Sequence, residues 1–380
     1  MFPATQPPAS ALRPTRAEVS LEALGYNLST IRGLLNGQKI YAVVKADAYG
    51  HGAVPVARHL AQNGVDAFAV ALVEEGVELR ESGIEHEILV LNGAYARTHR
   101  EILQYRLTPV VSDLSDLAVF QKLSRGRPIG IHLKVDTGMS RLGLPFCSLP
   151  DFLHELERCD AIRMNGLMTH LARADDDPET TAEQLRLFEH ALRLVSERGH
   201  QPLTIHAANS PGTIRHPEAH YSAVRVGLAL YGLKPAPTEV PLRPIMRWRS
   251  EIISLRLLAE DTGVGYCHSF KTSRQTRLAT LPIGYGDGLM RALSNRGFVL
   301  VRGRRCPIIG NISMDLTTVD VTDVKGCQLG DEAVIFGEQE GQSLSVDEVA
   351  SWAGTINYEI VTSISKRVPR FYLEKWEAHG

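Results

Sequence analysis

The first part of the chain alternates between short apolar runs and longer amphipathic stretches. Each run has the length of a strand and is rich in branched aliphatic residues, which predicts a strand buried on both faces. Eight such runs lie near residues 39–46, 66–71, 87–92, 107–112, 129–136, 162–169, 203–208 and 222–226. Apolar residues spaced three or four apart predict helices between them. The clearest helical stretches are 20–35, Ala53–Asn63, Leu72–Ser82, Leu149–Cys159 and Glu179–Arg198.

Eight strands joined by helix-length connections favour an α/β barrel of the (β/α)8, TIM-like type. An open, doubly wound sheet stays an alternative, because counting runs does not distinguish a closed sheet from an open one. Neither GxGxxG nor GxxxxGK[ST] follows the first run, which argues against a nucleotide-binding sheet.

The pattern changes after the proline-rich stretch Leu233–Pro241, which predicts a linker. We therefore expect an N-terminal extension (1–13), a barrel domain (14–240) and a mostly-β C-terminal domain (241–380). In the last of these, helical periodicity is confined mainly to Ser345–Ala353. Strands are expected at Ser250–Leu258, Arg277–Ile283, Phe298–Val301, Leu316–Val321 and Glu332–Phe336.

Composition narrows the class of protein. A chain of 380 residues exceeds one ordinary core, and 44% hydrophobic with 22% charged residues is typical of a globular enzyme. A net charge of -2 gives no reason to expect nucleic acid or an anionic membrane as a partner. Five cysteines without CxxC spacing argue against disulfides and a zinc site. With neither a signal peptide nor a membrane-length apolar run, we expect a cytoplasmic protein.

Reactive side chains cluster where the predicted strands end. Lys45 closes the first run, and an amine held among apolar groups has a lowered pKa and becomes a usable nucleophile. The alternative is a lysine that simply extends its ammonium into water. Barrel enzymes take their catalytic groups from the carboxyl ends of the strands, so a site is predicted there. The other runs end in Lys134 with Asp136, His170, Asn209 with Ser210, and Arg225 with Gly227.

Two glycine-containing turns after the last two runs predict a phosphate site. Ser210-Pro211-Gly212 and Val226-Gly227-Leu228 offer a hydroxyl and exposed amides where such barrels bind phosphate. A reactive lysine on the first strand then suggests pyridoxal phosphate, held as a Schiff base. Many sugar-phosphate enzymes share the same phosphate corner, so this cofactor is one of two interpretations.

The chain resembles the alanine racemase family from Arg16 to Ile360, over nearly its whole length. The resemblance depends on several motifs in the same order along the chain. They are Val44–Gly52 (VKADAYGHG), Lys134–Gly143 (KVDTGMSRLG), Arg225–Gly232 (RVGLALYG), Gly265-Tyr266, Gly284–Gly288 (GYGDG) and Ile312–Asp315 (ISMD).

The resemblance implies a role for each of these residues. Lys45 would carry pyridoxal 5'-phosphate and act as one base, with Tyr266 as the second base on the opposite face. Arg225 would face the pyridine nitrogen, and His170 would belong to the same network. The phosphate would be held by Tyr49, Ser210, Tyr358 and the amides of Gly227 and Leu228, with Asn209 beside it.

The same resemblance assigns the substrate side of the site. Arg141 and the Met314 amide would bind the substrate carboxylate, with Asp315 nearby, and Tyr285 would narrow the entrance. Lys134 matches a lysine that is carbamylated in many relatives. The stretch after Tyr266 departs from the family pattern, which leaves the details of the entrance open.

The function implied is that of a pyridoxal-phosphate-dependent isomerase that interconverts L- and D-alanine and supplies D-alanine for peptidoglycan. Relatives are homodimers with shared active sites. A serine or broad-specificity racemase on the same fold is the first alternative. A barrel-type decarboxylase would be expected to carry a carboxylate in place of Arg225. A non-catalytic cofactor-binding protein would lack the second domain with Tyr266 and Met314.

Overall fold

The computed structural model describes residues 12–95, 98–234, 238–374 and 376. The chain divides into two compact units. The barrel unit comprises Leu24–Ala48 and Ala53–Arg243, and the β unit comprises Met1–Ala23, Tyr49–Gly52 and Pro244–Gly380, as far as each is described.

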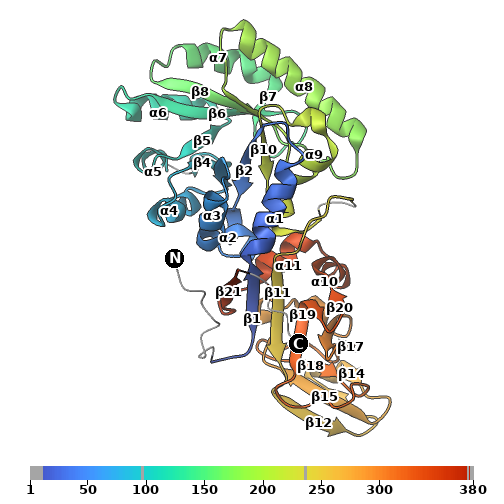
Figure 1. Ribbon diagram of the computed structural model, residues 1–380. Coiled ribbons are helices and arrows are strands. Elements are labelled where there is room, and N and C mark those ends of the chain that lie inside the picture. The colour runs from blue at the N-terminus through green and yellow to red at the C-terminus, as the bar shows by residue number, and fades with distance from the viewer. Residues whose placement is uncertain (1–11, 96–97, 235–237, 375, 377–380) are drawn as a thin grey trace. The chain divides into compact units, whose positions relative to one another are not determined.

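Eight parallel strands close into a barrel in the barrel unit. Figure 1 shows this unit, with helices such as α3 (Ala53–Gln62) and α8 (Pro178–Glu197) outside its strands. The sheet closes because β2 pairs with β10 and β5 pairs with β6, so the open-sheet alternative is wrong. All eight predicted strands are confirmed. They are β2 (Lys39–Val43), β3 (Ala67–Val70), β4 (Glu87–Val90), β5 (Thr108–Val111), β6 (Ile129–Asp136), β8 (Ile162–Met168), β9 (Thr204–His206) and β10 (Ala223–Val226). The short β7 (Leu144–Pro145) pairs with β6.

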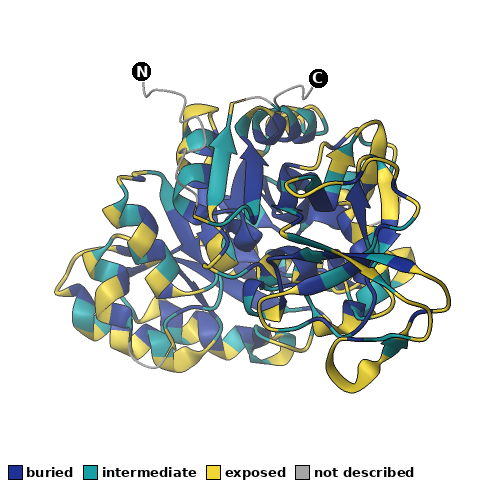
Figure 2. Ribbon diagram, turned by 90° about the horizontal axis from the view of Figure 1, so that it is seen from below, coloured by how far each residue is buried: buried dark blue, intermediate teal, exposed yellow. Residues whose placement is uncertain are grey.

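Helices follow the strands and cover the barrel. Figure 2 shows buried residues concentrated on the strands and exposed residues on the outward faces of the helices. The longest helix begins where Asp177 accepts a hydrogen bond from the Thr180 amide, 3.0 Å away, next to a proline at the first helical position. The helices are α1 (Leu21–Arg32), α3 (Ala53–Gln62), α4 (Val73–Glu81), α5 (His99–Gln104), α6 (Leu114–Ser124), α7 (Leu149–Glu157), α8 (Pro178–Glu197) and α9 (Ser210–Arg215).

The β unit is built on a seven-stranded sheet in the order β17-β16-β19-β11-β1-β21, with β20 beside β19. Its strands are β1 (Arg16–Ser20), β11 (Met246–Glu251), β16 (Phe298–Val301), β17 (Arg304–Pro307), β19 (Glu332–Gln339), β20 (Gln342–Leu344) and β21 (Arg370–Leu373). A three-stranded sheet contains β12 (Ser254–Leu258), β15 (Thr276–Leu281) and β18 (Thr317–Asp320). A small hairpin pairs β13 (Gly263–Val264) with β14 (Phe270–Lys271). Two helices, α10 (Val346–Ala353) and α11 (Asn357–Ser363), complete the unit.

The expected β-rich C-terminal half is confirmed, with two differences in detail. The run Ser250–Leu258 is not one strand, because it is divided between β11 and β12 in different sheets. Residues 14–23 lie in the β unit, because β1 pairs antiparallel with β11 and parallel with β21.

The expected boundaries at residues 13 and 240 remain a prediction of where independently folding domains begin and end. The proposed extension, 1–13, falls mainly on residues outside the described chain, and so do residues 235–237 of the expected linker. None of the described helices combines the length and the apolar composition needed to cross a membrane.

Candidate active site

Lys45 is followed by a left-handed helical turn, where we had expected a loop. It opens α2 (Lys45–Gly50), in which Ala46, Asp47, Ala48 and Tyr49 have φ angles of 51°, 53°, 51° and 55°. Left-handed helical geometry costs a residue with a side chain about 1–2 kcal/mol. Four such residues in a row therefore require support from their surroundings.

Two hydrogen bonds and one glycine supply that support. The Glu75 carboxylate accepts a hydrogen bond from the Ala46 amide, 2.6 Å away, and Asp47 accepts one from the Ala53 amide at 2.7 Å. Gly50 is the only residue that fits at the end of the turn, because an added Cβ would lie 2.2 Å from the Val361 carbonyl oxygen. The turn thus fixes the backbone that carries Lys45.

Five basic side chains influence one another at the carboxyl ends of the barrel strands. Burial lowers the pKa of Lys45, and the charge of Arg141 lowers it further. Burial lowers the pKa of Lys134 to about 8, with Arg225 and Arg141 as the next causes. The pKa of His170 lies well below its ordinary value, through burial and then through Arg225. Such an excess of positive charge attracts anions.

A carboxylate close to Lys134 is already engaged by backbone amides. Asp136, at the end of β6, accepts hydrogen bonds from the amides of Gly138, Met139 and Ser140 at 3.0, 3.0 and 3.1 Å. These bonds shape the turn that leads to Arg141. Asp136 raises the pKa of Lys134 less than either arginine lowers it.

Arg225, on β10, is buried without a carboxylate partner among the described residues. Its guanidinium donates to the carbonyls of Thr169, His206 and Ala207 at 2.8, 3.0 and 2.9 Å. It also contacts Nδ1 of His206 at 3.0 Å and Nδ1 of His170 at 3.2 Å. Burial lowers the pKa of Arg225 to about 10, so the group stays charged near neutral pH.

The predicted phosphate corner lies where the adjacent parallel strands β9 and β10 end. The Ser210 hydroxyl accepts from the amides of Gly227 and Ala229 at 3.0 and 3.3 Å. Asn209 caps α9 by accepting from the Gly212 amide at 3.0 Å, and Leu228 opens a second short helix. A hydroxyl beside two helix starts suits an anion.

Tyr266 lies on the β unit with its side chain 71% exposed. Its backbone is fixed, because the Asn311 amide group donates to the Tyr266 carbonyl at 2.9 Å. Gly265 on one side and Cys267 on the other have φ angles of 69° and 60°. Tyr266 is therefore exposed to solvent on a turn that the hydrogen bond from Asn311 helps to hold.

Tyr285 and Met314 lie on two loops of the β unit that are joined by backbone hydrogen bonds. The Tyr285 amide donates to the Ser313 carbonyl at 3.0 Å, and the Gly286 amide donates to the Met314 carbonyl at 2.9 Å. At Gly284 an added Cβ would lie 2.3 Å from the Ser313 oxygen, so this close approach requires glycine. Both predicted side chains are exposed, Tyr285 by 44% and Met314 by 53%.

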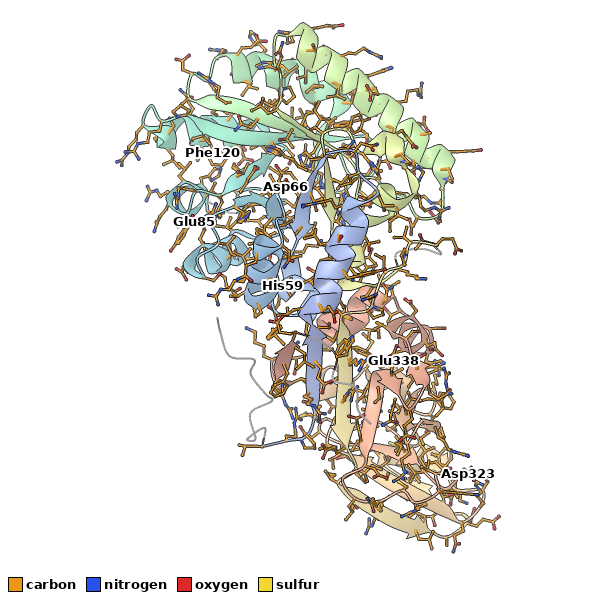
Figure 3. The ribbon with its side chains drawn as sticks, in the orientation of Figure 1. His59, Asp66, Glu85, Phe120, Asp323 and Glu338 are labelled. Carbon is orange, nitrogen blue, oxygen red and sulfur yellow. The ribbon has the colours of Figure 1, made fainter. Side chains whose placement is uncertain are left out.

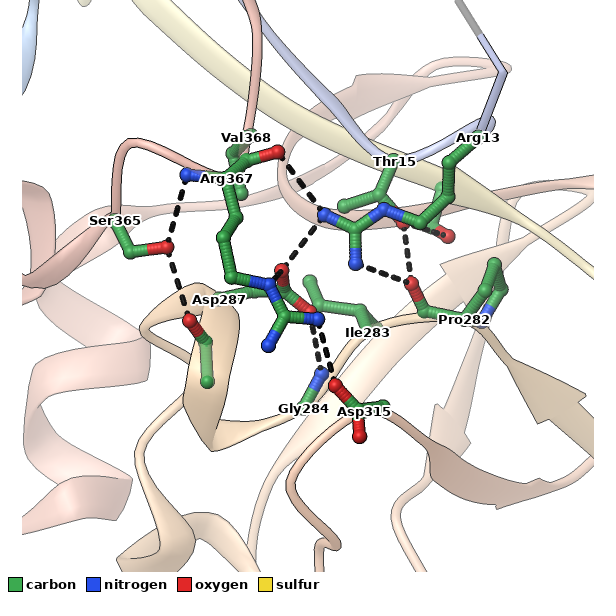
Figure 4. Close-up of polar contacts among 12 residues, drawn as sticks. Arg13, Thr15, Pro282, Ile283, Gly284, Asp287, Asp315, Ser365, Arg367 and Val368 are labelled. Atoms are coloured by element: carbon green, nitrogen blue, oxygen red, sulfur yellow. Dashed lines mark hydrogen bonds and ion pairs between the residues drawn. The ribbon is translucent and has the colours of Figure 1, made fainter.

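A fully buried carboxylate, Asp287, anchors these loops (Figure 4). It forms an ion pair with Arg13 at 2.7 Å and accepts from the Gly284 amide at 3.0 Å. Arg367 links Asp287, at 3.4 Å, to Asp315, at 2.6 Å. Asp315 thus contributes to a charge network that holds the Met314 loop.

The remaining predicted residues, Tyr49 and Tyr358, also belong to the β unit. Their ring centroids are 6.1 Å apart, with Tyr49 buried and Tyr358 half-buried. The predicted residues therefore fall into two groups. The barrel unit holds Lys45, Lys134, Arg141, His170, Asn209, Ser210, Arg225, Gly227 and Leu228, and the β unit holds Tyr49, Tyr266, Tyr285, Met314, Asp315 and Tyr358.

Comparison with known proteins gives the family. Residues 19–235 match the model of the alanine racemase N-terminal domain, and residues 245–372 match that of the C-terminal domain. The chain belongs to the alanine racemase family.

Individual alanine racemases resemble the chain over nearly its full length. The alanine racemase of Sorangium cellulosum is 47% identical over 379 residues, covering 96% of this chain and 100% of the relative. The solved alanine racemase from Streptomyces lavendulae has a TM-score of 0.91 at 35% identity, covering 96% of this chain and 98% of its own. That from Bartonella henselae, solved with covalently bound pyridoxal phosphate, has a TM-score of 0.88 at 32% identity, with 94% and 99% covered.

Three residues of this alanine racemase family member were missed by sequence reasoning. The sequence contains one indication for Glu75. It lies at the third position of α4, shortly after β3, where a glutamate commonly accepts hydrogen bonds from backbone amides. Asp287 was recognised as part of a motif but not as a buried anchor. His206 looks like an ordinary core residue in the sequence, and only its contact with Arg225 reveals its part in the site.

Proposed function

We propose that this protein racemises alanine, interconverting the L and D forms with pyridoxal 5'-phosphate, and so supplies D-alanine for peptidoglycan. The observation that carries the proposal is that one barrel holds both Lys45, whose pKa is lowered, and Arg225, which is buried with no carboxylate partner among the described residues. Both lie in a barrel that belongs to the alanine racemase family.

The donors present fit the cofactor. Lys45 offers an amine for covalent attachment, Ser210 and the helix starts beside it offer donors for a phosphate, and Arg225 offers a donor for the pyridine nitrogen. When bound, the cofactor supplies an electron sink that acidifies the Cα–H bond of an amino acid. The residues proposed to hold it are Lys45, Tyr49, His170, Asn209, Ser210, Arg225, Gly227, Leu228 and Tyr358.

Racemisation requires a proton acceptor on one face of the substrate and a proton donor on the other. The lowered pKa of Lys45 raises the fraction of its amine that is neutral, and the neutral amine is the form that can accept the proton. Tyr266 would serve the second face, where its phenol would exchange a proton with Cα. Arg141 and the Met314 amide would bind the carboxylate, and Tyr285 would narrow the entrance.

Arg225 decides which reaction follows. With pyridoxal phosphate bound, the charged guanidinium of Arg225 would disfavour protonation of the pyridine nitrogen and so weaken the electron sink that the cofactor supplies. A weaker electron sink would favour return of the proton to Cα, which is racemisation, over transamination. A barrel-type decarboxylase would be expected to have a carboxylate at this position.

The active unit is proposed to be a homodimer with shared active sites. Tyr266, Tyr285 and Met314 are 71%, 44% and 53% exposed, although the family resemblance assigns all three to the site. A second copy that covers this surface would bury them and bring Tyr266 to the barrel of its partner.

Reduction with borohydride should fix the cofactor on Lys45, and peptide mapping should find the adduct there. Lys45→Ala should abolish it, because the amine is lost. Lys39→Ala is the matched control, since Lys39 is exposed at the opposite end of β2 and should be dispensable. An adduct on any other lysine would overturn the assignment of Lys45.

The proposed preference for alanine is tested by assaying racemisation of L-alanine, L-serine and a panel of other L-amino acids. Alanine should be turned over with the highest kcat/KM. Comparable values for serine or for many amino acids would instead support the broad-specificity alternative.

Lys134 should carry a carbamate, because only a neutral amine reacts with carbon dioxide. Its pKa of about 8, against an ordinary 10.5, leaves neutral amine available near neutral pH. The product is an anion that Arg141 and Arg225 stabilise. In protein equilibrated with carbon-13 bicarbonate, a carbamate NMR signal should appear, weaken as the pH falls below about 8, and vanish in Lys134→Ala. Absence of the signal in the unaltered protein would contradict this prediction.

A further inference from the structure

The contact between Arg225 and His206 continues through the barrel core to the opposite end of the strands. Nε2 of His206 lies 2.8 Å from Nδ1 of His132, on β6. Nε2 of His132 lies 3.6 Å from the carboxylate of Glu87, the first residue of β4. The Tyr41 hydroxyl donates to the same carboxylate at 2.9 Å. The two histidines are buried, whereas the Glu87 side chain is 36% exposed.

Packing fixes the orientation of these rings. Tyr41 stacks on His206 with an interplanar angle of 7° and centroids 5.5 Å apart. His132 meets His206 edge-on at 5.0 Å. On β8, Gly166 provides the space for His132, because an added Cβ would lie 2.5 Å from its ring. The imidazoles therefore cannot turn freely to exchange their two nitrogens.

The direction of the hydrogen bonds follows from the two residues at the ends of this series, Arg225 and Glu87. The guanidinium of Arg225 has no acceptor atom, so Nδ1 of His206 must be unprotonated. His206 then carries its proton on Nε2 and donates to Nδ1 of His132. His132 in turn carries its proton on Nε2, facing Glu87, which as a carboxylate only accepts.

Each imidazole holds a single proton near neutral pH. Burial lowers the pKa of His132 to about 3, and that of His206 also lies well below its ordinary value. Burial and Glu87 raise the pKa of Tyr41, so its hydroxyl remains a donor. Only one arrangement of protons then satisfies every contact between Arg225 and Glu87.

We propose that Glu87 is a positioning residue for Arg225, acting through His132 and His206. Its carboxylate only accepts, so it supports the same order of protons that Arg225 requires, and this order keeps His206 an acceptor for the guanidinium. The kinetic consequence rests on the proposed function, whereas the order of protons does not.

Neutron diffraction from crystals of the unaltered, cofactor-bound protein tests the order of protons directly. Deuterium is expected on Nε2 of both His132 and His206, with none on either Nδ1. Deuterium on Nδ1 of either ring would overturn the proposal, whatever reaction the protein catalyses.

Charge reversal at Glu87 tests the consequence for catalysis. In Glu87→Lys the new side chain only donates, so His132 must accept, both tautomers reverse, and His206 presents a proton to Arg225. We expect kcat for alanine to fall roughly 10- to 100-fold, by analogy with the loss of the outer hydrogen-bond partner of a metal-binding histidine, with KM little changed. Glu87→Gln should have a smaller effect, because the Tyr41 hydroxyl can turn to accept from the amide.

Glu85→Lys is the matched control, since Glu85 is exposed two residues before Glu87 (Figure 3). It adds the same charge at the same end of the barrel without touching the histidines. Thermal denaturation shows whether each variant remains folded. If folded Glu87→Lys and Glu85→Lys had the same kcat, the role of Glu87 would be refuted. If the unaltered protein racemised nothing, the proposed function would fail while the neutron result still stood.

Discussion

Replacing Arg225 with glutamate is expected to lower racemisation on the order of 100-fold and to make transamination measurable as a side reaction. A carboxylate stabilises a protonated pyridine nitrogen and so strengthens the electron sink. A stronger electron sink would favour protonation at a carbon other than the substrate Cα, which leads to transamination. Pyruvate formed from alanine, measured alongside racemisation, gives the ratio of the two reactions.

The surroundings of Arg225 determine how this variant must be controlled. Its five acceptors are three carbonyls and two imidazole nitrogens, and none of them can donate as it stands. A glutamate there would require His170 and His206 to move their protons to Nδ1, or would lose their hydrogen bonds. Some loss of stability is therefore expected, and the melting temperature should be measured with cofactor bound.

Arg225→Lys separates the charge from the geometry. It keeps the positive charge but loses the planar fork that reaches several acceptors at once. It should therefore lose racemisation without gaining transamination. Full racemisation in folded Arg225→Glu, with no pyruvate formed, would show that Arg225 does not control the outcome of the reaction.

The barrel was predictable from sequence because its strands are buried on both faces. Such strands appear as continuous apolar runs, and alternation with helices then limits the possible folds. The predicted site residues also follow from this architecture, since the carboxyl ends of parallel strands meet at one end of the barrel. Strand β1 was not predicted, because both of its partners, β11 and β21, lie more than two hundred residues further along the chain.

The residues that hold Lys45 and Arg225 in place could not be predicted in the same way. The turn after Lys45 uses four non-glycine residues in a conformation that their own preferences disfavour, and contacts of Glu75 and Gly50 with distant backbone help to hold it. His132 and Glu87 each have ordinary positions in the sequence pattern. Their connection to Arg225 exists only because closing the barrel brings β4, β6, β9 and β10 around one core.

A mixture of two inactive variants is expected to regain roughly a quarter of wild-type activity if the site is shared between two chains. Lys45→Ala removes the base on the barrel unit, and Tyr266→Phe removes the proposed base on the β unit, so each homodimer should be nearly inactive. In a mixed dimer one site carries both lesions and the other carries neither. Random exchange makes about half of the dimers mixed, and half of the sites in those are intact.

The control is a second pair of variants whose lesions lie on the same unit. Lys45 and Arg141 both belong to the barrel unit, so mixing Lys45→Ala with Arg141→Ala leaves one lesion in every site and should restore nothing. Two different affinity tags confirm that subunits have exchanged, and circular dichroism confirms that each variant is folded. If both bases came from one chain, every site in the Lys45→Ala and Tyr266→Phe mixture would also keep a lesion. Recovery in the first mixture but not in the second therefore requires that Tyr266 act on the barrel of its partner, and equal inactivity of both mixtures would rule this out.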